Sequence, residues 1–192
     1  MEKRDVKPFI DVAMKDLIYK LNFITGYSIK KIGEDLCLHA INTGVGKELA
    51  PYFKREIKLD NVLYSPAVKP KKFPRTERQT ERISLKLSPN IYEYAYSLSF
   101  AIGCSIAKVV AYFMERSMND YDFLDLYVSE FLSEKMGDEQ KDFMQKIIND
   151  VNSDYLKDEN EDHNITALLL FIVDEYKAAE QSVDSTLHNF IS

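Results

Sequence analysis

An internal repeat constrains this chain more than any other feature. When the sequence is shifted by 77 residues, residues 5–43 align with residues 82–120 without a gap. Eight aligned positions are identical, whereas ordinary residue usage predicts about two by chance. Apolar residues coincide at further positions, such as Ile32 and Val109. Because such a repeat indicates duplicated structure, both segments are expected to share one fold. The identical pairs are Tyr19/Tyr96, Leu21/Leu98, Phe23/Phe100, Gly26/Gly103, Ser28/Ser105, Ile29/Ile106, Lys31/Lys108 and Asn42/Asn119.

The second copy begins with a strand pattern. Polar and apolar residues alternate with a period of two over residues 82–87, which is typical of a strand with one buried face. The side chains expected to face a core are Ile83, Leu85 and Leu87. The side chains expected to face outward are Arg82, Ser84 and Lys86.

Two helices follow this strand. Ser88 is a good N-cap and Pro89 suits the first helical position. Apolar residues then recur at intervals of three and four up to Gly103, which is expected to end the helix in a left-handed conformation. Ser105 is expected to cap a second helix. The repeated unit is therefore predicted to be strand, helix, tight turn, helix.

The first copy repeats this pattern less regularly. Val6, Pro8 and Ile10 take the inward positions of its strand, and Asp11 takes the place of the N-cap serine. Residues 26–28 repeat the turn between the helices. Since proline has no backbone N–H, strand pairing is predicted to be weaker at Pro8.

A short strand followed by two helices around a Gly-x-Ser turn resembles the ribbon-helix-helix superfamily of Arc, MetJ and CopG-type repressors. The resemblance covers about 78 of the 192 residues, and it is carried by residues 82–88 and 103–106, and by residues 6–11 and 26–29. In that family two strands pair antiparallel and the ribbon enters the DNA major groove. Here both strands lie on one chain. The resemblance therefore implies a mainly α fold with a two-stranded antiparallel ribbon, a tandem pseudo-dimer followed by a C-terminal helical domain.

The resemblance assigns base reading to the outward side chains of the ribbon. Arginine and lysine suit guanine, serine serves several bases, aspartate can accept from cytosine, and phenylalanine can contact a thymine methyl group. The last two are less typical readers, and both come from the first copy. The candidate base-reading residues are Arg82, Ser84 and Lys86 in the second copy, and Asp5, Lys7 and Phe9 in the first.

The same family binds phosphate at the start of the second helix of each copy, where unpaired amides and the helix dipole favour an anion. The corresponding residues are Tyr27 and Ser28, and Cys104 and Ser105. The segment before the second copy adds basic residues that could contact the DNA backbone or could form a plain solvated linker. These are Lys69, Lys71, Lys72, Arg75 and Arg78.

Four regions follow from these patterns. They are the first copy at 1–43, a basic linker at 44–81, the second copy at 82–120 and an acidic helical domain at 121–192. Within the linker, a short helix is predicted near 47–57 and an extended segment over 65–81. Within the acidic domain, helices are predicted at about 121–136, 139–156 and 165–189.

Charge divides the chain in two. Residues 1–118 hold 20 Lys and Arg against 13 Asp and Glu, and residues 119–192 hold 5 against 18, so that balances of +7 and −13 give the net charge of −6. The basic part can meet an anionic partner and the acidic part cannot. The run from Ala167 to Val173 is apolar on every side of its helix and needs burial. A homo-oligomer joined through the C-terminal helices is therefore expected.

Other function classes find little support. The run from Ala167 to Val173 is the longest apolar one, too short to span a bilayer, and no secretory segment is recognised. Cys37 and Cys104 lack metal or redox spacing, and no catalytic motif occurs. We therefore expect a cytoplasmic protein that binds double-stranded DNA, without enzymatic activity, cofactor, metal or membrane. The alternatives are a protein-interaction module that no longer reads DNA, and inhibition of the basic half by the acidic tail.

Overall fold

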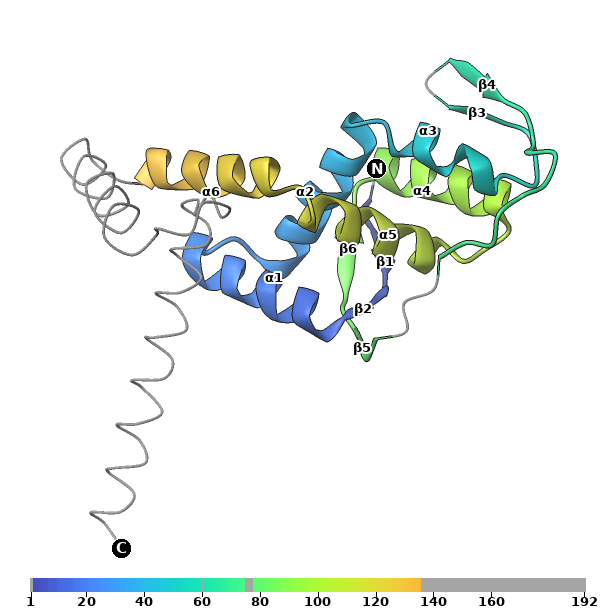
Figure 1. Cartoon of the computed structure of the whole chain (residues 1–192). Coiled ribbons are helices and arrows are strands. Elements are labelled where there is room, and N and C mark those ends of the chain that lie inside the picture. Colours follow the sequence, from blue (N-terminus) through green and yellow to red (C-terminus); the bar gives the residue numbers. More distant parts are fainter. Residues whose placement is uncertain (1, 60, 75–77, 136–192) are drawn as a thin grey trace, which may run out of the picture. The chain divides into compact units, whose positions relative to one another are not determined.

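The computed structural model describes residues 2–59, 61–74 and 78–135 (Figure 1). These residues are mainly helical, with short two-stranded antiparallel sheets, so the predicted fold class is confirmed at this level. The chain divides into two compact units. The first contains residues 1–22 and 26–120, and the described part of the second contains residues 23–25 and 121–135.

An antiparallel ribbon joins the two copies in the first unit (Figure 1). One register holds along its whole length, because Val6 faces Leu85 and Ile10 faces Glu81. The predicted antiparallel pairing is confirmed, with a register two residues away from the predicted partners 83–87. The pairing strands are β1 (Arg4–Val6) with β6 (Leu85–Leu87), and β2 (Phe9–Asp11) with β5 (Thr80–Arg82).

The ribbon is interrupted where proline was expected to weaken it. Lys7 and Pro8 lie between β1 and β2 and belong to neither strand. Pro8 can only accept, and its carbonyl oxygen takes the backbone N–H of Ile83 at 3.1 Å. The interruption therefore reflects a missing donor and not a change of register.

The two faces of the ribbon alternate as predicted. Every inward position is buried and every candidate base-reading position is exposed. The buried residues are Val6, Pro8, Ile10, Ile83, Leu85 and Leu87. The exposed residues are Asp5, Lys7, Phe9, Arg82, Ser84 and Lys86.

Each strand leads into a pair of helices at repeat-equivalent positions. Both turns use glycine in the left-handed region, with φ of 68° at Gly26 and 74° at Gly103, where a side chain would be strained. Both second helices are capped by serine as predicted, because Ser28 and Ser105 accept the backbone N–H three residues ahead. The helices are α1 (Val12–Thr25) and α2 (Ile29–Asn42) in the first copy, and α4 (Pro89–Ile102) and α5 (Ile106–Met118) in the second.

The first helices of the two copies are capped differently. Asp11 accepts the N–H of Ala13 at 2.8 Å with its own carboxylate, as predicted. Ser88 occupies the predicted N-cap position, but its side chain makes no capping hydrogen bond. Instead, the carboxylate of Glu34, which lies on α2 of the first copy, accepts the N–H of Ser88 at 2.9 Å. The second copy therefore depends on the first for its helix start.

The core lies between the ribbon and the second helices. α2 packs against α5 and β6, and Ile32, Leu36 and Phe113 are fully buried there. The hydroxyl of Ser117 donates to the carbonyl of Leu36 at 2.8 Å, so the one buried serine in this contact is satisfied. One face of the ribbon is buried against these helices, and the opposite face is left exposed.

The segment between the copies is folded. It contains α3 (Val45–Leu49), a 3₁₀ turn η1 (Ala50–Tyr52), and a hairpin of β3 (Ile57–Leu59) and β4 (Val62–Tyr64). The helix predicted over 47–57 is wrong beyond Leu49, because Pro51 cannot continue an α-helix. The hairpin was not predicted. Its period-two burial is carried by Ile57 and Leu59.

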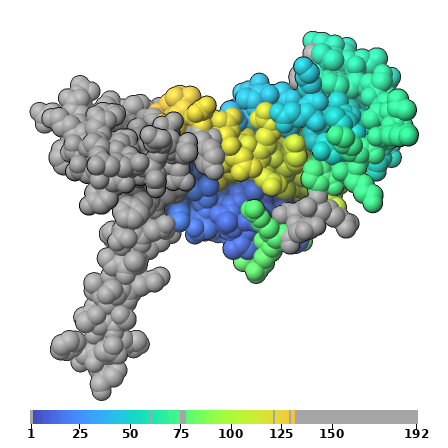
Figure 2. All heavy atoms as spheres, viewed as in Figure 1, coloured from blue at the N-terminus to red at the C-terminus, as the bar shows by residue number. Residues whose placement is uncertain are grey.

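This segment is attached to the second copy. Arg116 of α5 forms an ion pair with Glu48 of α3 at 2.5 Å, and the N–H of Lys54 donates to the carbonyl of Ala101 at 2.7 Å. In Figure 2 its atoms, cyan to green, form a continuous mass beside the yellow atoms of the second copy. Of the segment predicted to be extended over 65–81, residues 65–74 belong to no helix or strand, and the last two residues already belong to β5.

The acidic region begins with α6 (Tyr121–Lys135), which confirms the first of its three predicted helices. The other two, and the run from Ala167 to Val173, lie outside the described residues. No single helix in the described part is long and apolar enough to cross a bilayer. α4 and α5 reach that length and composition only together, across a 110° bend.

Candidate nucleic-acid interface

The exposed face of the ribbon combines side chains from both copies. Asp5 faces Lys86 and Phe9 faces Arg82 across the strands. Lys7 and Ser84 fall opposite each other between these pairs, and they are equivalent positions of the repeat because they differ by 77 residues. The two strands are thus related as they would be by a two-fold axis through the middle of the ribbon. The chemistry on the two sides of that axis differs.

Arg82 is held in place by its cross-strand neighbour. Its guanidinium lies over the ring of Phe9, 4.7 Å from the ring centre, and the ring itself is 52% exposed. Stacking on an aromatic face restrains an arginine while leaving its N–H groups available. Phe9 therefore supports Arg82, a role that the sequence alone did not suggest.

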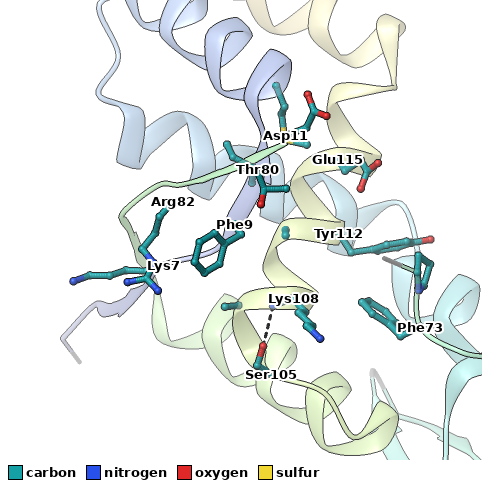
Figure 3. Close-up of a pocket in the computed structure, with 15 residues that line it drawn as sticks. Lys7, Phe9, Asp11, Phe73, Thr80, Arg82, Ser105, Lys108, Tyr112 and Glu115 are labelled. Carbon is teal, nitrogen blue, oxygen red and sulfur yellow. Dashed lines mark hydrogen bonds between the residues drawn. The ribbon is translucent and has the colours of Figure 1, made fainter. Parts of the chain in front are cut away.

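The start of α5 is the second element of this surface. Ser105 is exposed, and its hydroxyl accepts the N–H of Lys108 at 3.4 Å (Figure 3). The N–H of Cys104 donates to the carbonyl of Ser99 at 3.1 Å and is not available to a phosphate. The free first-turn amides of α5 are expected at Ile106 and Ala107. Anion binding at this helix start would therefore use Ser105 and the residues after it.

The Cys104 thiol adds no negative charge here. Burial raises its pKa, against the smaller lowering effects of Lys108 and Lys54. It therefore remains a neutral thiol at physiological pH and leaves the positive charge of Lys108 uncompensated.

Lys108 joins the helix start to the ribbon. It lines the same cavity as Lys7, Arg82 and Ser105, and Figure 3 shows it between the ribbon side chains and the opposite wall. None of the three cations is in an ion pair within the described residues. Lys108 was not predicted as a site residue. The signal that could have found it is its identity with Lys31 at an exposed position of the repeat.

The start of α2 in the first copy differs in charge. Lys31 forms an ion pair with Asp35 at 2.5 Å, one helical turn further along. The residue equivalent to Asp35 in the second copy is Tyr112. Ser28 is exposed like Ser105, and the carbonyl of Tyr27 accepts a hydrogen bond from the Asn22 amide at 2.6 Å. The equivalent lysine is therefore partly neutralised in the first copy.

The basic linker residues are distributed. Lys69, Lys71 and Lys72 are exposed, and Arg78 lies 3.8 Å from the carboxylate of Asp11. Arg75 lies outside the described residues. Within the described residues, none of the three lysines forms a side-chain hydrogen bond or ion pair with a ribbon residue, so their predicted role at the DNA backbone remains a prediction.

The described residues offer no cluster of three or more His, Cys, Asp and Glu side chains that could hold a metal ion. The chain was also compared with protein-family models, with curated proteins and with solved structures, and none matches it significantly.

Proposed function

We propose that residues 1–43 and 82–120 form a tandem ribbon-helix-helix pseudo-dimer that binds double-stranded DNA through its ribbon in the major groove. The observation that carries this proposal is the ribbon register, in which repeat-equivalent Lys7 and Ser84 fall opposite each other. A two-stranded ribbon with a polar exposed face fits the major groove.

The charge distribution supports the same function. Among the six candidate base-reading side chains, Lys7, Arg82 and Lys86 are positive and only Asp5 is negative. Lys108 adds a further cation at the start of α5. Positive side chains at the phosphates supply most of the affinity for DNA, and side chains at base edges supply the specificity.

Such a protein would be a transcriptional repressor or an accessory factor of plasmid or mobile-element maintenance, and it would act in the cytoplasm. The first test is fluorescence anisotropy of a labelled random duplex with the full chain. If about five phosphates are contacted, affinity should fall by about 10²–10³ between about 50 and 200 mM salt. Selection from a random duplex pool should then return a site whose two halves differ, because the two copies present different side chains.

The alternative is a protein-interaction module that keeps the fold but no longer reads DNA. Its motivation is Asp5, Pro8 and Phe9 in the first copy, since a carboxylate repels phosphate, proline weakens strand pairing and an exposed aromatic ring suits a protein surface. No anisotropy change on any duplex at low salt would favour this alternative. The stacking of Arg82 on Phe9 weighs against it, because the ring already has a partner.

We further propose that residues 121–192 join two chains. A dimer would carry two ribbons and could engage two sub-sites at once, which raises apparent affinity when the geometry allows both. Light scattering on the full chain and on residues 1–120 tests this proposal. A monomeric full chain at micromolar concentration, with operator affinity unchanged by the truncation, would refute it. Tighter binding by the truncated chain would instead indicate that the acidic region inhibits the basic half.

A further inference from the structure

A cavity of about 580 Å³ lies between the ribbon, α5 and residues 73–74 (Figure 3). Small-molecule sites usually measure roughly 300–1,000 Å³, so the volume suits a ligand of modest size. One wall is formed by Lys7, Phe9 and Arg82 of the ribbon, and the opposite wall by Phe73 and Tyr112. All of these residues belong to the first compact unit.

The wall opposite the ribbon is held by aromatic contacts. The ring of Phe73 lies 5.7 Å from that of Tyr112 on α5 and 5.8 Å from that of Tyr52 in η1, measured between ring centres. Edge and tilted contacts of this kind fix ring positions. The apolar lining continues with Met14 and Ala111. An apolar or aromatic group in the cavity would therefore meet preformed apolar surface.

The charges around the cavity are unequal. Lys7, Arg82 and Lys108 line it without ion-pair partners among the described residues. Two carboxylates also line it, and that of Asp11 is already used by the N–H of Ala13 and by Arg78. Glu115 is the second. The cations outnumber the acids, so the cavity favours an anionic ligand.

We propose that this cavity binds a small organic anion with an aromatic or apolar body, and that the bound anion competes with DNA. The competition with DNA rests on the proposed function, because an anion bound to Lys7, Arg82 and Lys108 would prevent these side chains from contacting DNA bases and phosphates. The acid group would lie near Lys108 and Arg82, and the apolar body between Phe9 and Phe73. DNA binding would thereby respond to a metabolite of that chemistry.

The first experiment measures the ligand site without DNA. The probe is 8-anilinonaphthalene-1-sulfonate, an aromatic sulfonate, titrated into the full chain with fluorescence detection. Saturable binding is expected, and Lys108→Ala should weaken it about tenfold, because a charge-assisted contact is lost.

Two variants make this result specific. Lys31→Ala removes the equivalent lysine of the first copy, which is paired with Asp35 and does not line the cavity, and should leave probe affinity within about twofold. Ala111→Phe should abolish saturable binding because it fills the cavity. Equal affinity in the Lys108 and Lys31 variants, or unchanged binding in Ala111→Phe, would overturn the site. Displacement by equimolar inorganic phosphate would also overturn it, because charge alone would then suffice.

The second experiment adds labelled duplex DNA. The probe should weaken DNA binding by the wild-type chain and have no such effect on Ala111→Phe. If probe and DNA bind together without mutual effect, competition is refuted while the ligand site stands. If the chain binds no DNA at all, the proposed function fails, and with it the regulatory half of this inference. The probe titration remains valid in either case.

Discussion

The two copies of the repeat have the same backbone plan and different chemistry at the same place. Lys31 and Lys108 both follow a capping serine at the start of a second helix. In the first copy Asp35 neutralises the lysine, and in the second copy Tyr112 stands at that position and lines the cavity instead. A single difference one helical turn away therefore decides whether this lysine has an ion-pair partner within the described residues.

The copies also differ in how they support each other. Glu34 of the first copy caps the first helix of the second, and the residue equivalent to Glu34 in the second copy is Ala111. Likewise, the ribbon position taken by Leu85 in the second copy is taken by Pro8 in the first. Two copies on one chain can therefore take different roles, since neither copy must satisfy both sides of a symmetric contact.

The largest effect is expected from the core of the ribbon. Leu85 is fully buried, so Leu85→Ala should lower the free energy of unfolding by about 2–5 kcal/mol. The equivalent change Pro8→Ala should cost about 1–2 kcal/mol, because fewer buried atoms are removed and the loss of proline adds unfolded-state entropy. Urea unfolding followed by circular dichroism measures both. Equal losses would show that the two strands contribute alike to the core.

Base reading is expected to be concentrated in the second copy. Arg82→Ala and Lys86→Ala should each weaken binding to the selected site by about 1–3 kcal/mol and relax base preference. Asp5→Ala in the first copy serves as the control and should not weaken binding, since it removes a carboxylate from an anion-binding face. An equal loss of affinity for selected and random duplexes would show that Arg82 and Lys86 contact phosphates and not bases.

The cap between the copies should be visible in stability and in its pH dependence. Glu34→Ala removes the acceptor of the Ser88 N–H and should cost about 1–2 kcal/mol at neutral pH. Burial raises the pKa of Glu34, but hydrogen bonds from Lys3 and from Ser88 outweigh this effect and leave its pKa below the usual range.

Because the pKa of Glu34 is lowered in the folded state, its effect on the free energy of unfolding depends on pH in a definite direction. The contribution of Glu34 is present above its unfolded pKa and is lost as pH falls through the lower folded pKa. The difference in unfolding free energy between wild type and Glu34→Ala should therefore shrink on acidification. A difference that stays constant from neutral to acid pH would mean that the Glu34 charge is not involved.

The smallest effect is expected from substituting the two equivalent lysines, Lys31 and Lys108. Lys108→Ala should reduce affinity for DNA about fivefold and lower the salt dependence by about one phosphate contact, roughly equally for all sequences. Lys31→Ala should have a weaker effect because Asp35 already compensates its charge. Asp35→Asn should free Lys31 and tighten binding. If both lysine variants lose affinity equally, the difference between the copies does not extend to phosphate binding.

Much of this architecture is encoded locally. The period-two alternation over residues 82–87 gives both the strand and its exposed face, and the glycine and serine of each turn give the helix boundaries. These signals depend on neighbours within a few residues, so they can be recognised without knowledge of the fold. The helix predicted over 47–57 was wrong and the hairpin after it was missed, because short segments with mixed patterns are decided by what they pack against.

The repeat, its elements and the inward and outward sides of the ribbon follow from the sequence alone. Three features depend on the tertiary structure. Glu34 caps the helix after Ser88, Arg82 lies over Phe9, and Phe73 completes a cavity beside Lys108. The partners in each of these contacts are between 35 and 73 residues apart. Local periodicity cannot specify such contacts, because they form only when the whole core fixes where distant segments meet.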